Sequence, residues 1–405
     1  MDTTIATVKT PWKKLASDRI LVPIFLEHFL VDGYISQRTV LLVFFSLTLG
    51  FNNTTLGVLT SVAVIATGLS QPLFGYLSDR IGNRILLFAA LLWTVLLFLA
   101  ATLVPGMGAA YLLILCSIGA GIFHPVGVAI SNQFGRTRYP ELQTTITSVF
   151  FLFGQTAFVA GPILAGWFLQ SGKPANLAWM ALAAIPLLIT LARGLRSREL
   201  PLVEKQIPEA EAAAMPAIRW RGWGLAALLL GMITQATLQQ SIFTFVPKHL
   251  GNLGLPSAVY GGASALFMIG CSAGNLLGGS LSDRYGKTRV AAISLILISI
   301  PVFIMSVTPY SWVWSLWMVL AGMCGGAAFP PLVVMGQQII RGGAAFIGGL
   351  VLGFIFSFGA LGLLAAGWLA DWQGIPLVLA ACSGLGLLGG VVTFFARPRP
   401  KGARL

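Results

Sequence analysis

Charged side chains are scarce in this 405-residue sequence: they make up 9% of the chain, against 57% for apolar residues. A soluble chain of ordinary composition carries about a quarter charged residues, because it must cover a water-facing surface. Acidic residues are the scarcer sign, with 12 Asp and Glu against 25 Lys and Arg. The shortage of charge excludes an ordinary soluble protein and predicts a surface that faces an apolar medium.

Cysteine and histidine are also few, with three His and four Cys in the whole chain. The cysteines all fall in apolar segments, without disulfide or metal-ligand spacing (Cys116, Cys271, Cys324, Cys382). An intramembrane enzyme would need a nucleophile with a base, or a metal cluster, and His28, His124 and His249 form no such set with the cysteines. We therefore expect no enzyme, no cofactor and no metal.

Long apolar runs, by contrast, recur along the whole chain, and each is long enough to cross roughly 30 Å of hydrocarbon as a helix. The period-two alternation of barrel strands is absent. The runs predict an all-α membrane protein with twelve transmembrane helices, at 20–47, 55–78, 84–104, 108–133, 143–170, 175–194, 223–249, 256–281, 288–308, 311–338, 344–369 and 374–396. The first eighteen residues show no signal-peptide pattern and are expected to form a tail.

The positive charge is distributed unevenly between the two ends of these helices. Of 25 Lys and Arg, only Arg38, Lys173 and Lys248 lie outside the tails and the even-to-odd loops, which leaves 22 on one side. Cytoplasmic loops of membrane proteins carry such an excess. The pattern predicts a multi-pass protein of the inner (plasma) membrane with both termini in the cytoplasm, and it explains the net charge of +13 without a nucleic-acid partner.

The sequence repeats itself at half its length. Gly75, Asp79 and Arg80 return as Gly279, Asp283 and Arg284 at an offset of 204, and Phe123 and Pro125 return as Phe329 and Pro331 at 206. Such internal repeats are typical of transporters. We predict a tail over 1–18, a six-helix bundle over 19–194, a charged, Pro-containing linker over 195–222, a second bundle over 223–396 and a tail over 397–405.

The repeated loop resembles the signature loop of the major facilitator superfamily. The resemblance implies two pseudo-symmetric bundles around a central cavity that rock to expose it to either side. It also implies that the two loops act as gates, through Gly75, Asp79, Arg80 and Gly82 in the first half and Gly279, Asp283, Arg284 and Gly286 in the second.

A narrower resemblance is to the fosmidomycin-resistance branch of proton-driven exporters. It is carried by His28 and Asp32, four apart on the first helix, and by Phe123, His124 and Pro125 on the fourth. Val126 stands where that branch usually has Glu, so the resemblance implies proton-coupled export and no particular cargo. In the fifth helix, Gly161, Pro162 and Gly166 are similar to the antiporter motif of multidrug exporters, which also favours export.

The first helix carries four ionisable residues inside an apolar span. A charge at the bilayer centre costs about 2.5–3.5 kcal/mol even on insertion scales, so such residues usually serve function. His28 and Asp32 share a helix face. By helix geometry, His124 lies at a depth comparable with Glu27 and His28. We predict that Glu27, His28, Asp32 and His124 couple transport to protons, with Asp32 near the midplane.

Other polar residues of the spans are candidates for the substrate cavity. Arg38 either attracts an anionic substrate or neutralises Glu27 and Asp32. The remaining candidates are amides, which could equally make interhelical hydrogen bonds: Gln155, Gln235, Gln239, Gln240, Asn275 and Gln337. His249, beside Lys248 at the outer end, is expected to be solvated.

The residues thus favour a monomeric secondary transporter with a small molecule, protons and the bilayer as partners. The leading hypothesis is proton-coupled export of an amphipathic or anionic compound. The alternative is a symporter that imports an organic anion such as a carboxylate, with Arg38 as its anchor.

Overall fold

The computed structural model describes residues 15–139, 142–194, 222–339 and 344–396, and this part of the chain is helical without a strand. Its helices make twelve candidate membrane spans. The spans are α2 (Leu21–Ser36) with α3 (Arg38–Leu49), α4 (Asn53–Ile81), α5 (Asn83–Leu103), α6 (Met107–Arg138), α7 (Gln143–Leu169), η2 (Pro174–Ala184) with α8 (Ile185–Gly194), α10 (Gly222–Asn252), α11 (Ser257–Tyr285), α12 (Lys287–Val307), α13 (Trp314–Gln337), α14 (Ala344–Gln373) and α15 (Ile375–Thr393). The predicted fold class is confirmed.

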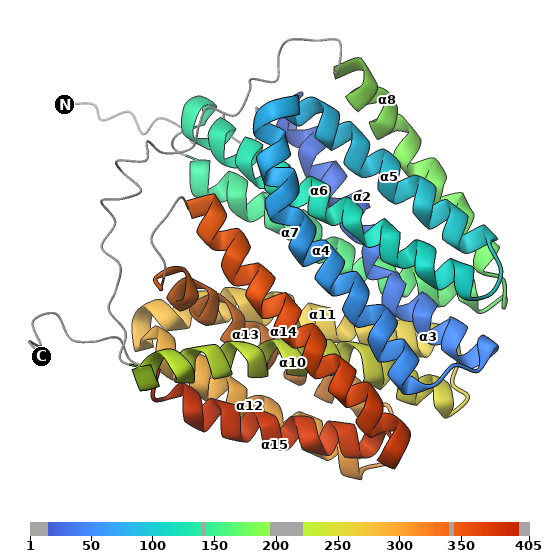
Figure 1. Cartoon of the computed structure of the whole chain (residues 1–405), viewed down its shortest axis with the longest axis vertical. Coiled ribbons are helices and arrows are strands. Elements are labelled where there is room, and N and C mark those ends of the chain that lie inside the picture. The colour runs from blue at the N-terminus through green and yellow to red at the C-terminus, as the bar shows by residue number, and fades with distance from the viewer. Residues whose placement is uncertain (1–14, 140–141, 195–221, 340–343, 397–405) are drawn as a thin grey trace, which may run out of the picture.

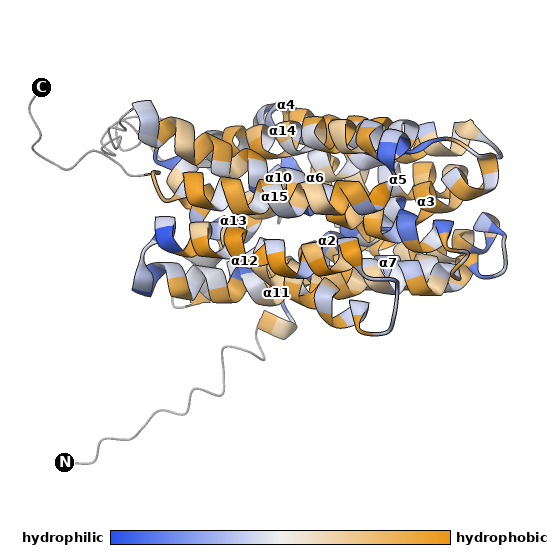
Figure 2. Cartoon of the chain, turned by 90° about the horizontal axis from the view of Figure 1, so that it is seen from below, coloured by the Kyte–Doolittle hydropathy of each residue, from blue (hydrophilic) through white to orange (hydrophobic). Residues whose placement is uncertain are grey.

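Helices suit such a chain because each satisfies its own backbone hydrogen bonds, which hydrocarbon cannot do. Figure 2 shows hydrophobic residues, in orange, along most of the helix length, and hydrophilic residues, in blue, mainly at helix ends and in loops. Many large apolar side chains are exposed along the spans, among them Leu69, Leu276 and Leu388. The surface is therefore apolar where a bilayer would surround it.

Two bundles of helices lie side by side, one from each half of the sequence (Figure 1). Within the first, α4, α5 and α6 pack closely, and α2 packs on α7; within the second, α11 packs on α13 and α12 on α15. Glycines allow the tightest of these contacts: a Cβ on Gly274 or Gly322 would collide with the backbone of the facing helix. Residues 1–14, 140–141, 195–221, 340–343 and 397–405, which include most of the predicted linker and tails, lie outside the described residues.

We call the end of the bundles where α2 begins and α15 ends the tail side, and the opposite end the far side. The halves meet toward the far side, where α4 crosses α14 and α7 crosses α11. A Cβ on Gly57 would lie 3.2 Å from the Leu363 carbonyl oxygen, and Gly261 faces Gly166 equally closely. In Figure 1 the two bundles diverge toward the tail side. The conformation is therefore closed on the far side.

The first span is broken into α2 and α3, whereas the sequence predicts one helix over 20–47. The Ser36 hydroxyl and the Gln37 side-chain amide both donate to the Gly33 carbonyl, at 3.1 and 3.0 Å. Side chains that compete for backbone carbonyls weaken a helix locally. As a result α2 packs on first-half helices, while α3 also contacts α10 and α11 of the second half.

The sixth span also departs from the prediction of an α-helix over 175–194. Its first eleven residues form the 3₁₀ helix η2, and the α-helix begins at Ile185. Pro186 follows at once, and its ring removes an N–H donor and crowds the preceding turn. The Tyr34 hydroxyl donates to the Met180 carbonyl at 2.8 Å, which ties α2 to this span.

Candidate functional site

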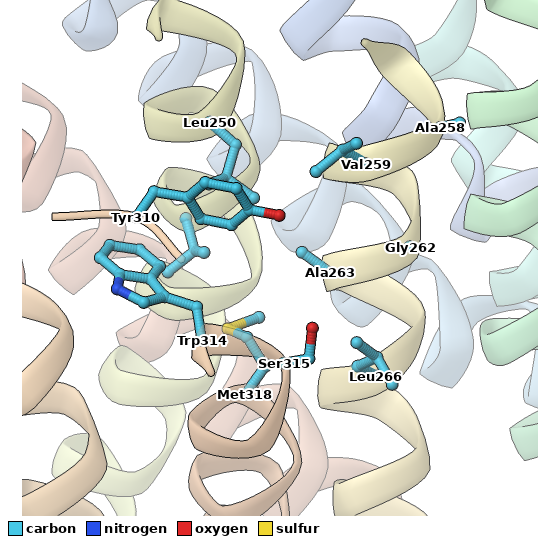
Figure 3. A pocket seen from close by; sticks show the side chains of 11 residues that line it. Leu250, Ala258, Val259, Gly262, Ala263, Leu266, Tyr310, Trp314, Ser315 and Met318 are labelled. Carbon is cyan, nitrogen blue, oxygen red and sulfur yellow. The ribbon is translucent and has the colours of Figure 1, made fainter. Parts of the chain in front are cut away.

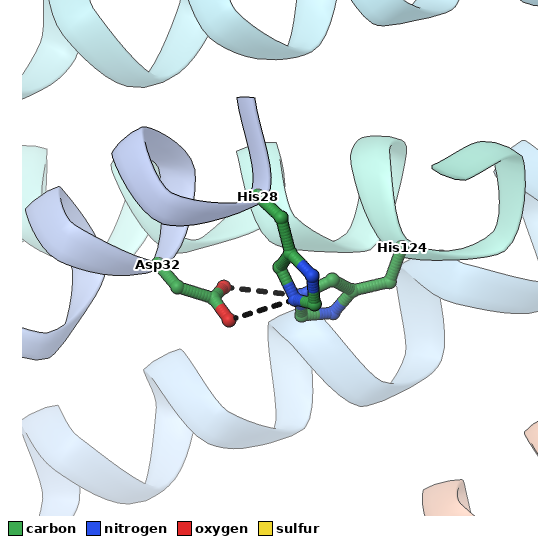
Figure 4. Close-up of side chains that lie close together, drawn as sticks. All are labelled: His28, Asp32 and His124. Atoms are coloured by element: carbon green, nitrogen blue, oxygen red, sulfur yellow. Dashed lines mark hydrogen bonds and ion pairs between the residues drawn. The ribbon is translucent and has the colours of Figure 1, made fainter. Parts of the chain in front are cut away.

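Three ionisable side chains meet inside the first bundle, carried by two different helices (Figure 4). His28 and Asp32 project from α2, one helical turn apart, and His124 reaches them from α6. The helix α7 closes the remaining side, because it packs along α2 and carries Phe150 beside the His28 ring. We call His28, Asp32 and His124 the His–Asp cluster.

The Asp32 carboxylate lies between the two imidazoles. His28 Nε2 is 3.1 Å from Asp32 Oδ2, and His124 Nε2 is 3.0 Å from Asp32 Oδ1. His28 and Asp32 are buried, and the His124 side chain is 27% exposed. The cluster is therefore reachable from solvent through His124. The predicted pairing of His28 with Asp32, and the matched depth of His124, are both seen in the structure.

A backbone carbonyl decides how many protons the cluster holds. His28 Nδ1 lies 2.7 Å from the Phe150 carbonyl oxygen, which only accepts, so Nδ1 carries a hydrogen. A neutral imidazole would then point the lone pair of Nε2 at Asp32, and two acceptors at 3.1 Å repel each other. One further proton must therefore lie between His28 and Asp32, on either partner.

The proton count sets the net charge of the cluster. A neutral His124 with its hydrogen on Nε2 satisfies the second contact to Asp32. With the further proton on His28 or Asp32, the three side chains together are neutral; without it they carry one negative charge. In surroundings of low dielectric an uncompensated charge is costly. The arrangement is thus able to take up and release one proton.

Aromatic rings and a glycine shape the walls of the cluster. The His28 ring stacks against Phe150 with centroids 4.0 Å apart and approaches Phe123 at 5.3 Å. Gly154 on α7 faces the cluster directly: a Cβ there would lie 2.8 Å from Asp32 Oδ2 and 2.7 Å from His28 Cε1. Neither Phe150 nor Gly154 is marked by a pattern in the sequence, so sequence reasoning missed both.

The same three side chains also make a possible metal-ligand set. Two imidazole nitrogens and one carboxylate oxygen lie within 4.8 Å of one another. Imidazole and carboxylate are common ligands of divalent transition metals. In the structure each nitrogen instead faces a carboxylate oxygen at hydrogen-bond distance. This set is not found among the histidines and cysteines alone, because Asp32 supplies its third ligand.

Glu27 does not join the cluster, although the sequence places it next to His28. Its side chain is fully buried, and neither carboxylate oxygen has a hydrogen-bond partner among the described residues. A buried carboxyl group in that situation favours its neutral form. Glu27 therefore has no hydrogen bond to Asp32, His28 or His124.

Arg38 lies at the start of α3 and pairs with neither Glu27 nor Asp32 in the described part of the chain. Its Nη1 donates to Ser117 Oγ at 2.5 Å, and its Nε is buried without a partner. The neutralising role that the sequence analysis considered is therefore not seen in this conformation. Within the described ranges, the guanidinium is thus a positive group without an acidic partner.

The amide candidates are spread over several helices. Gln235 Nε2 donates to Gln239 Oε1 at 2.7 Å and toward the Gly325 carbonyl at 3.3 Å, which joins α10 to α13. Asn275 has a buried Oδ1 without a described partner. Of the other amides, Gln155 and Gln240 are half-buried and Gln337 is exposed.

The two predicted gating loops have matching backbone geometry. Gly82 and Gly286 adopt φ of 90° and 93°, a conformation that favours glycine, and each ends one span and begins the next. Arg80 stacks over Tyr76 at 4.5 Å, and Arg284 lies over Tyr285 at 5.3 Å. Of the other gate candidates, Gly75 faces Pro125, and a Cβ on Gly279 would meet nothing within 4 Å. Asp283 is exposed, and the Asp79 side chain lies outside the described part.

The antiporter-like motif lies at the helix crossing that closes the far side. A Cβ on Gly166 would collide with α11 at Ser257 and Gly261, and the Pro162 carbonyl oxygen also faces Gly261. Gly161 packs within the first half, against Ser36. Two residues of the motif thus allow close approach of the two bundles.

Sequence reasoning also missed a cluster at the tail-side end of α2. The Asp18 carboxylate accepts hydrogen bonds from the backbone N–H of Ile20 and Leu21 and from the Tyr139 hydroxyl, and it pairs with Arg138 at 3.2 Å. Burial acts to raise the pKa of Asp18, but these hydrogen bonds and the Arg138 charge outweigh it and lower the pKa. The carboxylate is thereby held ionised, and it joins the start of α2 to the end of α6.

The prediction that His249 is solvated is met only in part, and its neighbour Lys248 is enclosed by the fold. Lys248 is buried, and His249 is half-buried with its ring stacked on Trp314, centroids 5.7 Å apart. The reason is that α10 continues to Asn252 instead of ending at residue 249. Both residues therefore lie in its last turns, packed against neighbouring elements.

A separate cavity of 190 Å³ lies in the second half, among α10, α11 and the start of α13 (Figure 3). Its lining is mostly aliphatic, with Tyr310 and Trp314 as an aromatic wall, and the Tyr310 and Ser315 hydroxyls face the space. None of the predicted site residues lines it. The cavity is distinct from the His–Asp cluster.

Comparison with known protein families identifies the kind of molecule that holds this site. The family model of the Major Facilitator Superfamily matches residues 24–262 and again residues 228–405. The chain belongs to the major facilitator superfamily. The resemblance inferred from the repeated gating loops is confirmed. The superfamily consists of transporters, in agreement with the prediction that the chain is not an enzyme.

Two curated members of the superfamily are similar to this chain over most of its length. The fosmidomycin resistance protein of Escherichia coli (strain K12) is 26% identical over 402 residues, covering 96% of this chain and 95% of that protein. The uncharacterized MFS-type transporter YfnC of Bacillus subtilis (strain 168) is 24% identical, covering 91% of each. The narrower resemblance therefore has support along the whole sequence.

Solved structures show the same fold at low sequence identity. A bacterial homologue of the human lysosomal transporter Spinster, in an inward-facing and occupied conformation, aligns with a TM-score of 0.76 at 15% identity, over 93% of this chain and 96% of that one. A D-xylose–proton symporter aligns with a TM-score of 0.68 at 16% identity, over 96% and 99%. At these identities the likeness concerns the fold.

Proposed function

We propose that this secondary transporter is a proton-coupled exporter of a small amphipathic or anionic compound, working as a monomer in the inner membrane with its tail side in the cytoplasm. The observation that carries the proposal is the proton required between His28 and Asp32. The orientation follows from the 22 basic residues of the tail side. The described conformation is then open toward the cytoplasm.

Proton occupancy and conformation are linked through the charge of the cluster. When the cluster releases its proton it carries one negative charge, and enclosing that charge in a low-dielectric interior is unfavourable. The loaded, neutral cluster can be enclosed at lower cost. Protons that enter from outside therefore drive the return to the cytoplasm-open state. Release of the proton there, through the partly exposed His124, prepares the cluster for the next cycle of export.

Arg38 supports an acidic group on the cargo. Its guanidinium is held by Ser117 and lacks an acidic partner among the described residues, so a carboxylate or other acidic group of the cargo would compensate its charge. The name of the Escherichia coli relative, the fosmidomycin resistance protein, is in line with export. The same Arg38 would equally anchor an organic anion in a proton-coupled importer, which is the second candidate.

The test is proton movement in liposomes that contain the purified transporter and a pH-sensitive dye, with an imposed proton gradient and a panel of amphipathic and anionic solutes. Export coupling predicts that a solute releases protons across the bilayer and that Asp32→Asn stops this release. Glu27→Gln is the matched control: it replaces the neighbouring buried acid on the same helix by an amide without touching the cluster.

The outcomes separate the candidates. Outside acidification drives an antiporter's cargo out and a symporter's cargo in. Solute exchange without proton movement, or unchanged coupling in Asp32→Asn, would rule out the cluster as the proton site. Loss of coupling in Glu27→Gln and not in Asp32→Asn would move the proton site to Glu27.

A further inference from the structure

The far ends of α4 and α14 are joined by a charged contact between the two halves. Asp371, near the end of α14, accepts hydrogen bonds from the backbone N–H groups of Asn53 and Thr54, at 2.8 and 2.7 Å. These N–H groups open the first turn of α4, which belongs to the other half. A carboxylate of the second bundle thus caps a helix of the first.

Residues of the first half satisfy only some of the backbone N–H groups at the start of α4, and Asp371 accepts hydrogen bonds from two others. The first N–H groups of a helix have no partner within the helix. Asn52 Oδ1 accepts from Thr55 N–H at 2.9 Å, which leaves Asn53 and Thr54 to Asp371. The start of a helix also carries partial positive charge, so a carboxylate binds there more strongly than a neutral group.

The backbones beneath the contact are close enough to make it possible. A Cβ on Gly367, one turn before Asp371, would lie 2.7 Å from the Asn53 carbonyl oxygen. About two turns further in along α4, the buried Ser61 hydroxyl donates to the Ala360 carbonyl at 2.7 Å. Opening the far side would break all of these contacts together and would leave Asp371 without its two N–H donors.

The equivalent crossing on the opposite side of the molecule has a neutral contact instead. There the Ser257 hydroxyl, at the start of α11, donates to the Gly166 carbonyl at 2.6 Å. Lys248 on α10 is the charged neighbour of Asp371, and both residues belong to the second half. Lys248 therefore remains near Asp371 in either conformation, whereas the contact with α4 exists only when the far side is closed.

We propose that Asp371 is a positioning residue for transport: its carboxylate latches the far side closed through the N-terminus of α4 and so sets the balance between the two access states. The inference rests on alternating access, which two-bundle transporters share, and it is independent of the proposed proton coupling and of the cargo.

The test uses a reporter cysteine under the latch. Ser61→Cys is introduced into a chain whose four native cysteines are replaced by Ala, and its reaction with a water-soluble maleimide is timed in purified protein. Adding Asp371→Asn should raise the labelling rate about two- to tenfold, the range that one charge at a helix N-terminus supports. Asp371→Glu, which keeps the carboxylate, should restore a rate near that of the parent.

Two controls separate a latch from general loosening. Lys173→Gln changes one charge on the same face, outside the contact, and should leave the rate unchanged. Asn52→Ala removes the other cap of α4, which comes from its own half, and should also leave the rate near the parent value. The proposal is overturned if folded Asp371→Asn, checked by size-exclusion chromatography, labels like the parent, or if Asn52→Ala accelerates labelling as strongly as Asp371→Asn.

Discussion

A single backbone carbonyl gives the His–Asp cluster its chemistry. Because Phe150 occupies His28 Nδ1, the other ring nitrogen can meet Asp32 only across a proton. A His–Asp pair without that carbonyl could place its hydrogen on Nε2 and remain satisfied with the cluster deprotonated. The position of α7 against α2 therefore converts an ordinary pair into a proton-binding one.

Gly154→Ala tests how closely α7 must approach the cluster. The new methyl group would come within 2.8 Å of Asp32 Oδ2, so the side chains must shift apart and the hydrogen bonds must lengthen. We expect a loss of proton-coupled transport of about tenfold or more, the effect of misplacing reacting groups by about 1 Å. The measurement is proton release in dye-loaded liposomes.

Gly384→Ala is the matched control for that substitution, because a Cβ at this position meets nothing within 4 Å. It should leave transport unchanged and, by replacing a helical glycine, should stabilise the protein by about 0.5–1 kcal/mol or less. Equal transport in both alanine variants would contradict the assigned geometry of the cluster.

At the scale of elements, Asp18 holds the start of α2 through two backbone N–H groups and links it to the end of α6. The lowered pKa of Asp18 means that the folded state favours the ionised carboxylate. Its contribution to the free energy of unfolding is therefore fully present above the ordinary Asp pKa of 3.8 and is lost as pH falls through the lowered value.

Asp18→Asn should accordingly destabilise the protein by about 1 kcal/mol at neutral pH, in the range of a lost helix cap. The difference from the parent should shrink in acid, toward pH values below 3.8. Thermal unfolding in detergent at several pH values measures it. A difference that stays constant with pH would show that the charge of Asp18 is not what stabilises the start of α2.

The helix crossings of the far side depend on residues without side chains. Gly261→Val should keep α11 from approaching Gly166 and so disfavour the far-side-closed conformation. We expect faster labelling of the Ser61→Cys reporter and slower transport, from a folded protein. If labelling stayed at the parent rate, close approach of these glycines would not be what closes the far side.

At the scale of the whole molecule, the distribution of charge makes the orientation testable. A cysteine at Trp312, which is 82% exposed on the far side, should react with an impermeant maleimide added to intact cells. A cysteine at the exposed Arg193, at the tail-side end of α8, should react only after the membrane is permeabilised. The reverse pattern would place the termini outside and invert the proposed direction of transport.

The sequence by itself determined the class, the twelve spans and the two-bundle fold. Hydropathy over about twenty residues and a repeat at half the chain length can both be found without knowing which helices pack together. It also predicted that His28 meets Asp32, since residues four apart share a helix face. The break at Gln37 and the 3₁₀ start of the sixth span were not predicted, because apolar periodicity does not show side chains that compete for backbone hydrogen bonds.

Only the tertiary structure decided which distant groups complete each site. Phe150 lies 122 residues from the His28 that it holds, and Asp371 lies 318 residues from the Asn53 that it caps. It also left Glu27 without a hydrogen bond to the cluster and gave Arg38 the Ser117 hydroxyl as its partner, where the sequence had left open a pairing of Arg38 with Glu27 and Asp32. Spacing along one helix determines which side chains share a face. Which other helix covers that face depends on how all the spans pack together. The hydrogen bonds, charge pairs and proton sites made at that face therefore depend on the tertiary structure.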